Sequence, residues 1–185
     1  EGLMGRSREA HVPALLEIFD IPYTFSDVLV CALTLDKAMT KQVIRSAGLN
    51  TPDFWVVRDF SDVAAIPRNF PLFAKPLAEG TGKGIGEQSK IMNAAALESI
   101  CENLLERFEQ PVLVEIYLPG REFTVGVLGA AKKARVAGLM EVNIRPGAMV
   151  STYSLHAKEE CEKWIDYNPV PAGRLRVALE ELAIN

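Results

Sequence analysis

A glycine-rich segment with nearby lysines is the part of the sequence whose residue types most directly suggest chemistry. The segment AEGTGKGIG, residues 78–86, has glycine at every second position from Gly80 and contains Lys83. It follows an apolar run that ends at Lys75. Backbone N–H groups in such loops can hold phosphate, because glycine lets the backbone approach a ligand closely. Lysine supplies a point charge for phosphate, so the loop and its two lysines fit a triphosphate.

The glycine spacing matches neither of two familiar phosphate-binding patterns. G-x-x-x-x-G-K-[ST] requires Ser or Thr after its lysine, whereas Gly84 follows Lys83 here. G-x-G-x-x-G fails because the glycines recur in steps of two. Taken alone, the loop is explained equally well as an exposed surface loop without a ligand.

Two glutamates lie on either side of a Pro-Gly turn in VLVEIYLPGREFTVGVLG, residues 112–129. Glu115 comes near the end of an apolar strand pattern, and Glu122 begins the next one. A carboxylate accepts hydrogen bonds, and the adenine amino group and ribose hydroxyls are suitable donors. Two solvated glutamates at a hairpin are the plainer alternative.

Hydrophobic periodicity and turn residues predict the elements that must position these side chains. Asp36 and Asn93 are expected to cap helices, and Gly48 is expected to end the first of these two helices. A helix over 12–19 and a last helix near Arg174 complete the helical pattern. Strands are predicted at 54–57, 71–75, 112–118, 122–128 and 134–144, and a short strand followed by a turn is predicted within 21–27. Helices mixed with antiparallel hairpins indicate an α+β fold.

The composition restricts the class of protein. Hydrophobic residues make up 49% of the 185 residues and charged residues 24%, with a net charge of -4. This balance is typical of a folded globular chain and disfavours nucleic-acid binding. The longest strongly apolar run, 28–35, is too short to cross a membrane. Three widely spaced cysteines favour a reducing, cytoplasmic setting, and no His/Cys cluster has the spacing of zinc ligands.

Four ordered blocks resemble the D-alanine–D-alanine ligase branch of the ATP-grasp superfamily. The first block is similar to the end of the family's N-terminal domain, and the second to its DK-x-x-x-K helix with GL-x-TP. The third is similar to the KP-x-x-EGSS-x-GI strand and lid, and the fourth to VLIE-x-x-L-x-G-x-EFTV. These blocks read EGLMGRSREAHVPALLEIFDIPYTFSD, LDKAMTKQVIRSAGLNTPDF, FPLFAKPLAEGTGKGI and VLVEIYLPGREFTVGVLG.

The resemblance implies a role for each matched residue. Lys37 and Lys75 correspond to the two lysines that contact ATP phosphates, and Glu115 to the acceptor of the adenine amino group. Ile116 and Leu118 correspond to the backbone beside adenine, Glu122 to the ribose-binding glutamate, and Lys158, as a weak match, to a catalytic lysine. The lid over the phosphates corresponds to Glu79, Gly80, Thr81, Gly82, Lys83 and Gly84.

The resemblance also implies an ATP-grasp fold preceded by the tail of an α/β domain. The expected domains are 1–33, the end of the N-terminal substrate-binding domain; 34–117, the central subdomain with the lid; and 118–185, part of the C-terminal subdomain. The implied reaction is ATP-dependent joining of two amino acids through an acyl phosphate, with D-alanine for cell-wall synthesis as substrate. A homodimer is a possible assembly.

Two departures from the family pattern keep alternatives open. The lid reads TGK where the ligases usually read SS, and Arg6, Arg8 and Glu9 replace an acidic GED motif. A ligase-like enzyme with another amino-acid or peptide substrate therefore remains an alternative, as does a nucleotide-binding protein without catalysis. The family's Mg²⁺ ligands, Asp, Glu and Asn near the C-terminus, have no counterpart in this sequence. We therefore expect the chain, which begins at Glu1 and not at Met, to be incomplete at both ends and inactive alone.

Overall fold

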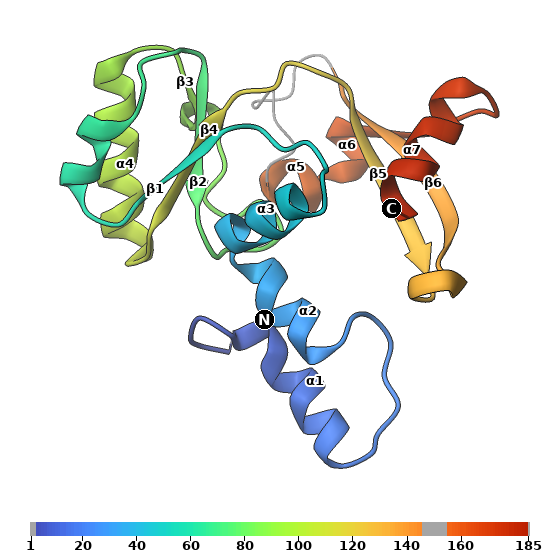
Figure 1. Ribbon diagram of the computed structural model, residues 1–185. Coiled ribbons are helices and arrows are strands. Elements are labelled where there is room, and N and C mark those ends of the chain that lie inside the picture. Colours follow the sequence, from blue (N-terminus) through green and yellow to red (C-terminus); the bar gives the residue numbers. More distant parts are fainter. Residues whose placement is uncertain (1–2, 146–154, 185) are drawn as a thin grey trace. The chain divides into compact units, whose positions relative to one another are not determined.

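The computed structural model describes residues 3–145 and 155–184, and its contacts divide the chain into two compact units. Unit 1 is Glu1–Leu118 and unit 2 is Pro119–Asn185. Figure 1 shows the helices and strands of both units in sequence colours. Each unit combines helices with an antiparallel sheet, so the predicted α+β class is confirmed.

Unit 1 is built on a four-stranded sheet in the order β1-β4-β2-β3, with antiparallel pairing throughout. Three of its strands were predicted, at 54–57, 71–75 and 112–118, and the observed bounds differ from these by two residues or fewer. The short third strand was not predicted. The strands are β1 (Phe54–Val57), β2 (Leu72–Pro76), β3 (Lys90–Ile91) and β4 (Val112–Ile116).

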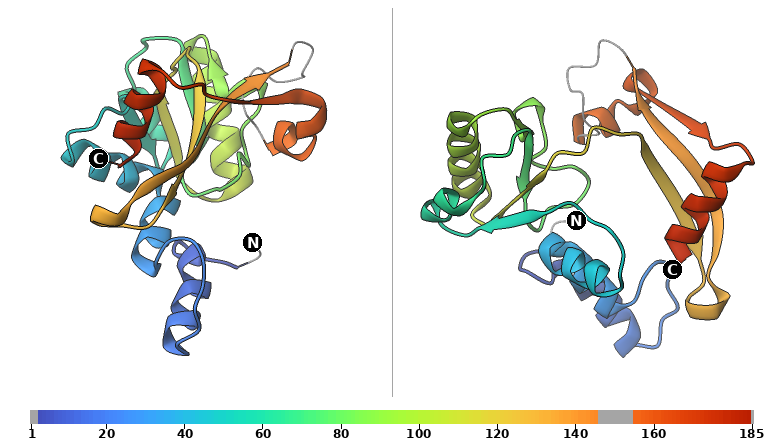
Figure 2. Two further views of the ribbon diagram at one scale, coloured as in Figure 1. Left: turned by 90° about the vertical axis from the view of Figure 1, so that its right-hand side faces the viewer. Right: turned by 45° about the horizontal axis from the view of Figure 1, so that its top comes forward.

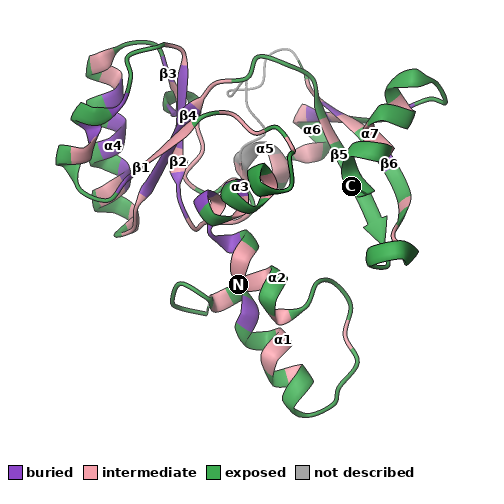
Figure 3. Ribbon diagram, viewed as in Figure 1, coloured by how far each residue is buried: buried purple, intermediate pink, exposed green. Residues whose placement is uncertain are grey.

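Helix α4 (Ala94–Phe108) covers one face of this sheet, as Figure 2 shows from two directions. The predicted cap is confirmed, because the Asn93 side chain accepts a hydrogen bond from the Ala96 N–H. Alternate strand residues such as Leu72, Ala74, Val112 and Val114 pack against the helix face that contains Leu97, Ile100, Cys101 and Leu104. Figure 3 shows the buried residues concentrated in β2, β4 and the inner face of α4.

Helix α3 (Lys37–Ser46) packs on the other face of the sheet. Ala38 contacts Leu77 and Leu113 in a small second core. Asp36 caps the helix as predicted, accepting from the N–H groups of Ala38 and Met39. Gly48, with φ of +78°, lies just beyond the helix end, where its N–H bonds the carbonyl of Arg45. Lys75 and Glu115 project from the same face of the sheet and bond to each other.

The N-terminal part of unit 1 differs from the prediction. Helices α1 (Arg8–Ile18) and α2 (Val28–Leu35) pack against each other. The short strand predicted within 21–27 is wrong, because that segment is an irregular connection without strand pairing. A strand needs a neighbour to satisfy its backbone groups, and no strand of the described residues pairs with it. The predicted apolar helix face is largely exposed, with Phe19 70% accessible.

The connection between β1 and β2 contains one further element, the 3₁₀ helix η1 (Phe60–Ala65). Asp59 and Asp62 close its first turn through reciprocal capping bonds. A second 3₁₀ helix, η2 (Glu87–Ser89), leads from the glycine-rich segment into β3. The chain therefore returns to the sheet edge directly after the loop.

Unit 2 contains a three-stranded antiparallel sheet in the order β5-β6-β7. Helix α7 (Arg174–Ile184) packs along β5 and β6, and Figure 2 shows it beside them. The described part of the region 145–171 contains α5, α6 and β7. The elements are β5 (Glu122–Leu128), η3 (Ala131–Lys133), β6 (Arg135–Ile144), α5 (Leu155–Glu159), α6 (Cys161–Trp164) and β7 (Ile165–Pro169).

A membrane-spanning helix would have to be both long and apolar. No helix within 3–145 and 155–184 meets both conditions.

Candidate functional site

The start of α3 and its first turn bring two lysines to the sheet face opposite α4. Lys37 and Lys41 are four residues apart, so both side chains project from the same side of the helix. Lys37 Nζ donates to the carbonyl oxygens of Leu77 (3.1 Å) and Glu79 (2.5 Å). The helix thereby connects its first residue to the segment that follows β2.

The pairing of β2 with β4 brings Lys75 and Glu115 together. Lys75 is opposite Leu113 and Phe73 is opposite Glu115 in the register, so these side chains share one face of the sheet. Lys75 Nζ donates to Glu115 Oε1 at 2.5 Å. The predicted phosphate-binding lysine and the predicted adenine acceptor are therefore directly bonded here.

Glu115 is a buried carboxylate held by two cations. Its residue is 8% exposed, and Lys41 Nζ lies 2.7 Å from Oε2. Lys41 contacts Oε2 as an ion pair, and this oxygen is buried. Burial raises the pKa of Glu115, but the charges and hydrogen bonds of Lys75 and Lys41 more than offset this and hold it below its usual value.

Lys37 has an unusual electrostatic setting. The pKa of its amino group is lowered to about 8, mainly by burial and then by the charges of Lys75 and Arg8, against the opposing charges of Glu79 and Glu115. Three lysines and Arg8 thus face two carboxylates in this basic cluster, which we define as Arg8, Lys37, Lys41, Lys75, Glu79 and Glu115. An anion placed here would relieve the repulsion between the cations.

The glycine-rich loop consists of two tight turns and not of a single extended arch. The Lys83 N–H bonds the Gly80 carbonyl, and the Ile85 N–H bonds the Gly82 carbonyl. Thr81, Gly82 and Gly84 have positive φ angles of 56°, 86° and 79°. A Cβ at Gly84 would lie 2.5 Å from Pro76 Cγ, so glycine is required for this approach to β2.

Glu79 joins the loop to the rest of unit 1. Its Oε1 accepts from Gln110 Nε2 at 2.8 Å and lies 3.4 Å from Arg8. Its Oε2 lies 3.5 Å from Lys83. The carboxylate therefore ties the predicted lid to α1 and to the segment that precedes β4.

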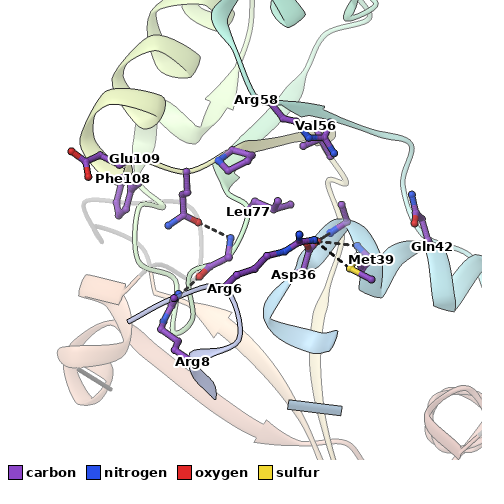
Figure 4. Close-up of a pocket in the computed structure, with 15 residues that line it drawn as sticks. Arg6, Arg8, Asp36, Met39, Gln42, Val56, Arg58, Leu77, Phe108 and Glu109 are labelled. Carbon is purple, nitrogen blue, oxygen red and sulfur yellow. Dashed lines mark hydrogen bonds and ion pairs between the residues drawn. The ribbon is translucent and has the colours of Figure 1, made fainter. Parts of the chain in front are cut away.

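A cavity of about 560 Å³ lies beside the beginning of α3. Figure 4 shows Arg6 reaching Asp36 and Met39 across it, with Arg8 beneath. Arg8 donates to the Ala78 carbonyl at 2.6 Å. None of the predicted site residues lines this cavity, so it is separate from the Lys75–Glu115 pair.

The remaining predicted residues lie at the end of unit 1 or in unit 2. Ile116 ends β4, where its N–H bonds the Asp53 carbonyl at 3.0 Å, and Leu118 is 64% exposed. Glu122 is the exposed first residue of β5, opposite Val142. Lys158 is half-buried in α5. Unit 1 alone brings together Lys37, Lys75, Glu79 and Glu115.

Three residues of the site were not predicted from the sequence. Lys41 contacts Glu115, while Arg8 and Gln110 contact Glu79. For Lys41 a signal was present, because the DK-x-x-x-K spacing places it one helical turn after Lys37. Arg8 and Gln110 are distant in sequence from Glu79, and only the folded chain brings them close.

A metal centre is not formed by the residues described. Within 3–145 and 155–184, no three His, Cys, Asp or Glu side chains are grouped to hold an ion. Glu79 and Glu115, the two carboxylates of the basic cluster, are both occupied by cationic side chains.

Comparison with known sequences finds one family model that matches most of the chain. The model is described as the D-ala D-ala ligase C-terminus and matches residues 43–170. A curated D-alanine–D-alanine ligase from Aquifex aeolicus is 40% identical over 129 residues, which are 68% of this chain and 43% of that protein. The chain therefore spans less than half the length of this relative.

Solved structures with the same fold include two ligases. The VanG D-Ala:D-Ser ligase from Enterococcus faecalis superposes with a TM-score of 0.72 and 22% identity, covering 95% of this chain and 50% of that one. A D-alanine–D-alanine ligase from Bacillus anthracis, solved in complex with ATP, has a TM-score of 0.66 and 21% identity, covering 95% and 54%. At this identity the likeness concerns the fold, which is that of the ATP-grasp ligases.

Proposed function

The chain belongs to the D-alanine–D-alanine ligase family, and from that premise we propose that it is the nucleotide-binding part of an ATP-dependent carboxylate–amine ligase. The complete enzyme would join two D-alanine molecules into a dipeptide for cell-wall synthesis. Residues 1–33 would belong to the N-terminal domain, 34–117 to the central ATP-grasp subdomain and 118–185 to the C-terminal subdomain.

One observation carries the proposal: the four cationic side chains of the basic cluster face two carboxylates, Glu79 and Glu115. Burial and the neighbouring charge of Lys75 lower the pKa of Lys37, and the negative charge of a triphosphate would oppose both effects. Glu115 Oε2 is a buried carboxylate oxygen paired with Lys41, and its second lone pair can accept a hydrogen bond from the amino group of adenine. Both ends of ATP therefore find chemically suitable partners on the same sheet face.

Each residue then has a proposed task. Lys37 and Lys75 bind phosphate oxygens, and the lid from Glu79 to Gly84 supplies backbone N–H groups. Glu115 accepts from adenine, whose edge meets the backbone at Ile116 and Leu118. Glu122 and Lys158, both in unit 2, are proposed for the ribose and for the reacting groups.

The chemistry follows from these positions. An acyl phosphate forms when the carboxylate of one amino acid takes the terminal phosphoryl group of ATP, and the amine of the second then displaces phosphate. Phosphoryl transfer depends mainly on positioning and on neutralising charge, which the lysines supply. Closure of the lid over the phosphates would exclude water from the acyl phosphate.

Magnesium is expected in such a reaction, but the described residues do not form a site for it. The carboxylates of the basic cluster are paired with lysine and arginine, and no other suitable group is present within 3–145 and 155–184. We therefore assign no residue of this chain to the metal.

Nucleotide binding can be tested directly by calorimetry on the 185-residue chain with ATP. Lys75→Ala should weaken ATP binding by roughly 10- to 100-fold, the scale of a lost charge-assisted hydrogen bond. Lys132→Ala, which removes an exposed lysine of unit 2, is the control and should leave affinity unchanged. Equal affinities of wild type and Lys75→Ala would remove Lys75 from the site.

The substrate is tested separately, by phosphate release from the full-length enzyme. D-alanine should support release better than other amino acids. A strong preference for a different amino acid would indicate the ligase-like alternative, which the TGK lid sequence and Arg8 near the lid favour.

A further inference from the structure

Lys41 is a buried lysine with no place in the proposed contacts to ATP. Its side chain is 11% exposed, and its Nζ lies 2.7 Å from Glu115 Oε2 and 2.7 Å from Thr51 Oγ1. The same amino group lies 5.5 Å from the centre of the Phe54 ring. These three contacts from β4, the segment before β1 and β1 itself hold the ammonium in one position.

Lys41 and Lys75 divide the Glu115 carboxylate between them. Lys75 holds Oε1, and Lys41 faces Oε2. Lys75 is also assigned to phosphate, so its charge is shared once a nucleotide binds. Within 3–145 and 155–184, the anionic partner of Lys41 is Glu115, and its other contacts are to Thr51 Oγ1 and the Phe54 ring.

The protonation state of Glu115 determines which base it can accept. A carboxylate only accepts hydrogen bonds, whereas a carboxylic acid also donates one. Adenine presents an amino donor at position 6, and hypoxanthine presents a carbonyl acceptor at the same position. An ionised Glu115 therefore favours ATP and leaves two acceptors facing each other when ITP binds.

We infer that Lys41 is a positioning residue for base specificity, which keeps Glu115 ionised and aimed so that the site selects adenine over a 6-keto purine. The inference rests on the proposed nucleotide site. Burial alone would raise the pKa of Glu115, and Lys41 is one of the two cations that oppose this. Without Lys41, Glu115 is protonated at a higher pH and can donate to the carbonyl of hypoxanthine.

The ratio of ATP affinity to ITP affinity tests this role. Calorimetry on the full chain between pH 6 and pH 8 should show wild type preferring ATP by roughly 10- to 100-fold. Lys41→Met should reduce that preference to about threefold or less at pH 6, with partial recovery at pH 8, because protonation of Glu115 controls it. Lys41→Arg retains the charge and should restore most of the preference.

Arg45→Met is the matched control. Arg45 lies on the same helix and over the same Phe54 ring, at 5.0 Å, but it pairs with the exposed Asp53 and not with Glu115. This variant should keep the wild-type ratio at every pH. Should Lys41→Met not fold, Thr51→Val removes only the second anchor of Lys41 and should lower the ratio severalfold.

The outcomes separate the two hypotheses. If wild type binds neither nucleotide, the proposed function fails and this inference falls with it. If wild type prefers ATP but Lys41→Met weakens both nucleotides equally, Lys41 is merely structural and the inference is overturned. An unchanged ratio in a folded Thr51→Val variant would overturn it when Lys41→Met cannot be measured.

Discussion

Nucleotide affinity should fall steeply as the pH rises through 8, because Lys37 loses its charge in that range. The pKa of its amino group is about 8, lowered first by burial and then by Lys75 and Arg8, against the opposing effects of Glu79 and Glu115. Between pH 7.5 and pH 9.5 the charged fraction falls from about 0.8 to about 0.03. If only the charged form binds phosphate, ATP affinity drops about 25-fold, or about 2 kcal/mol.

Calorimetric titration of ATP at half-unit steps from pH 7 to pH 9.5 measures this effect. The terminal phosphate of ATP is ionised through most of this range, so the ligand contributes little to the change. Lys37→Arg keeps a charged side chain throughout, and its affinity should vary less than about twofold. Adenosine lacks phosphate and should bind wild type with no dependence on Lys37.

The sign of the effect on stability follows from the same shift. The folded pKa lies below the ordinary value of 10.5, so between about pH 8 and 10.5 the unfolded chain binds more protons. The free energy of unfolding should therefore rise with pH across that range, by up to about 3 kcal/mol. Saturating ATP should abolish the rise by keeping Lys37 charged.

A pH-independent ATP affinity in wild type would refute the reasoning. It would mean either that Lys37 has an ordinary pKa in the folded chain or that it does not contact phosphate. Titration of the Lys37 amino nitrogen by NMR distinguishes these cases. A midpoint near 8 that does not move when ATP is added would exclude the phosphate contact.

Three further changes test the fold and the loop. Asn93→Ala removes the cap of α4 and should cost about 1 kcal/mol in urea unfolding. Gly84→Ala places a Cβ against Pro76 and should weaken ATP binding. Gly48→Ala is the control, because Gly48 has a similar φ but no atom within 4 Å of its added Cβ, and it should weaken ATP binding less. Equal losses of ATP affinity in the two variants would contradict a role for the close approach of Gly84 to Pro76. Glu115→Gln leaves Lys41 and Lys75 without their anion and should lower the free energy of unfolding by roughly 3 kcal/mol at pH 7. Because the pKa of Glu115 is lowered in the folded chain, the difference in unfolding free energy between wild type and variant should shrink as the pH falls below about 4.5. Acid unfolding measures this difference.

The sequence predicted well those elements whose stabilising contacts are made between residues close together in the chain. Asp36 and Asn93 cap their helices through bonds that span three residues or fewer, so the sequence order alone places the partners. Strands β1, β2 and β4 of the main sheet followed from short apolar runs, whereas the two-residue β3 did not. The strand prediction for 21–27 failed because a strand requires a partner, which is a property of the tertiary structure.

The sequence by itself determined which chemical groups are available: two lysines near a glycine-rich loop, and a glutamate at the end of an apolar strand. Their identity and order sufficed to indicate a nucleotide site and the ligase family. Only the tertiary structure decided which charges meet, because the β2–β4 register joins Lys75 to Glu115 and α3 delivers Lys41 to the other oxygen. The tertiary structure also buries Lys37 among residues that are far apart in the chain, and this burial is the main cause of its lowered pKa.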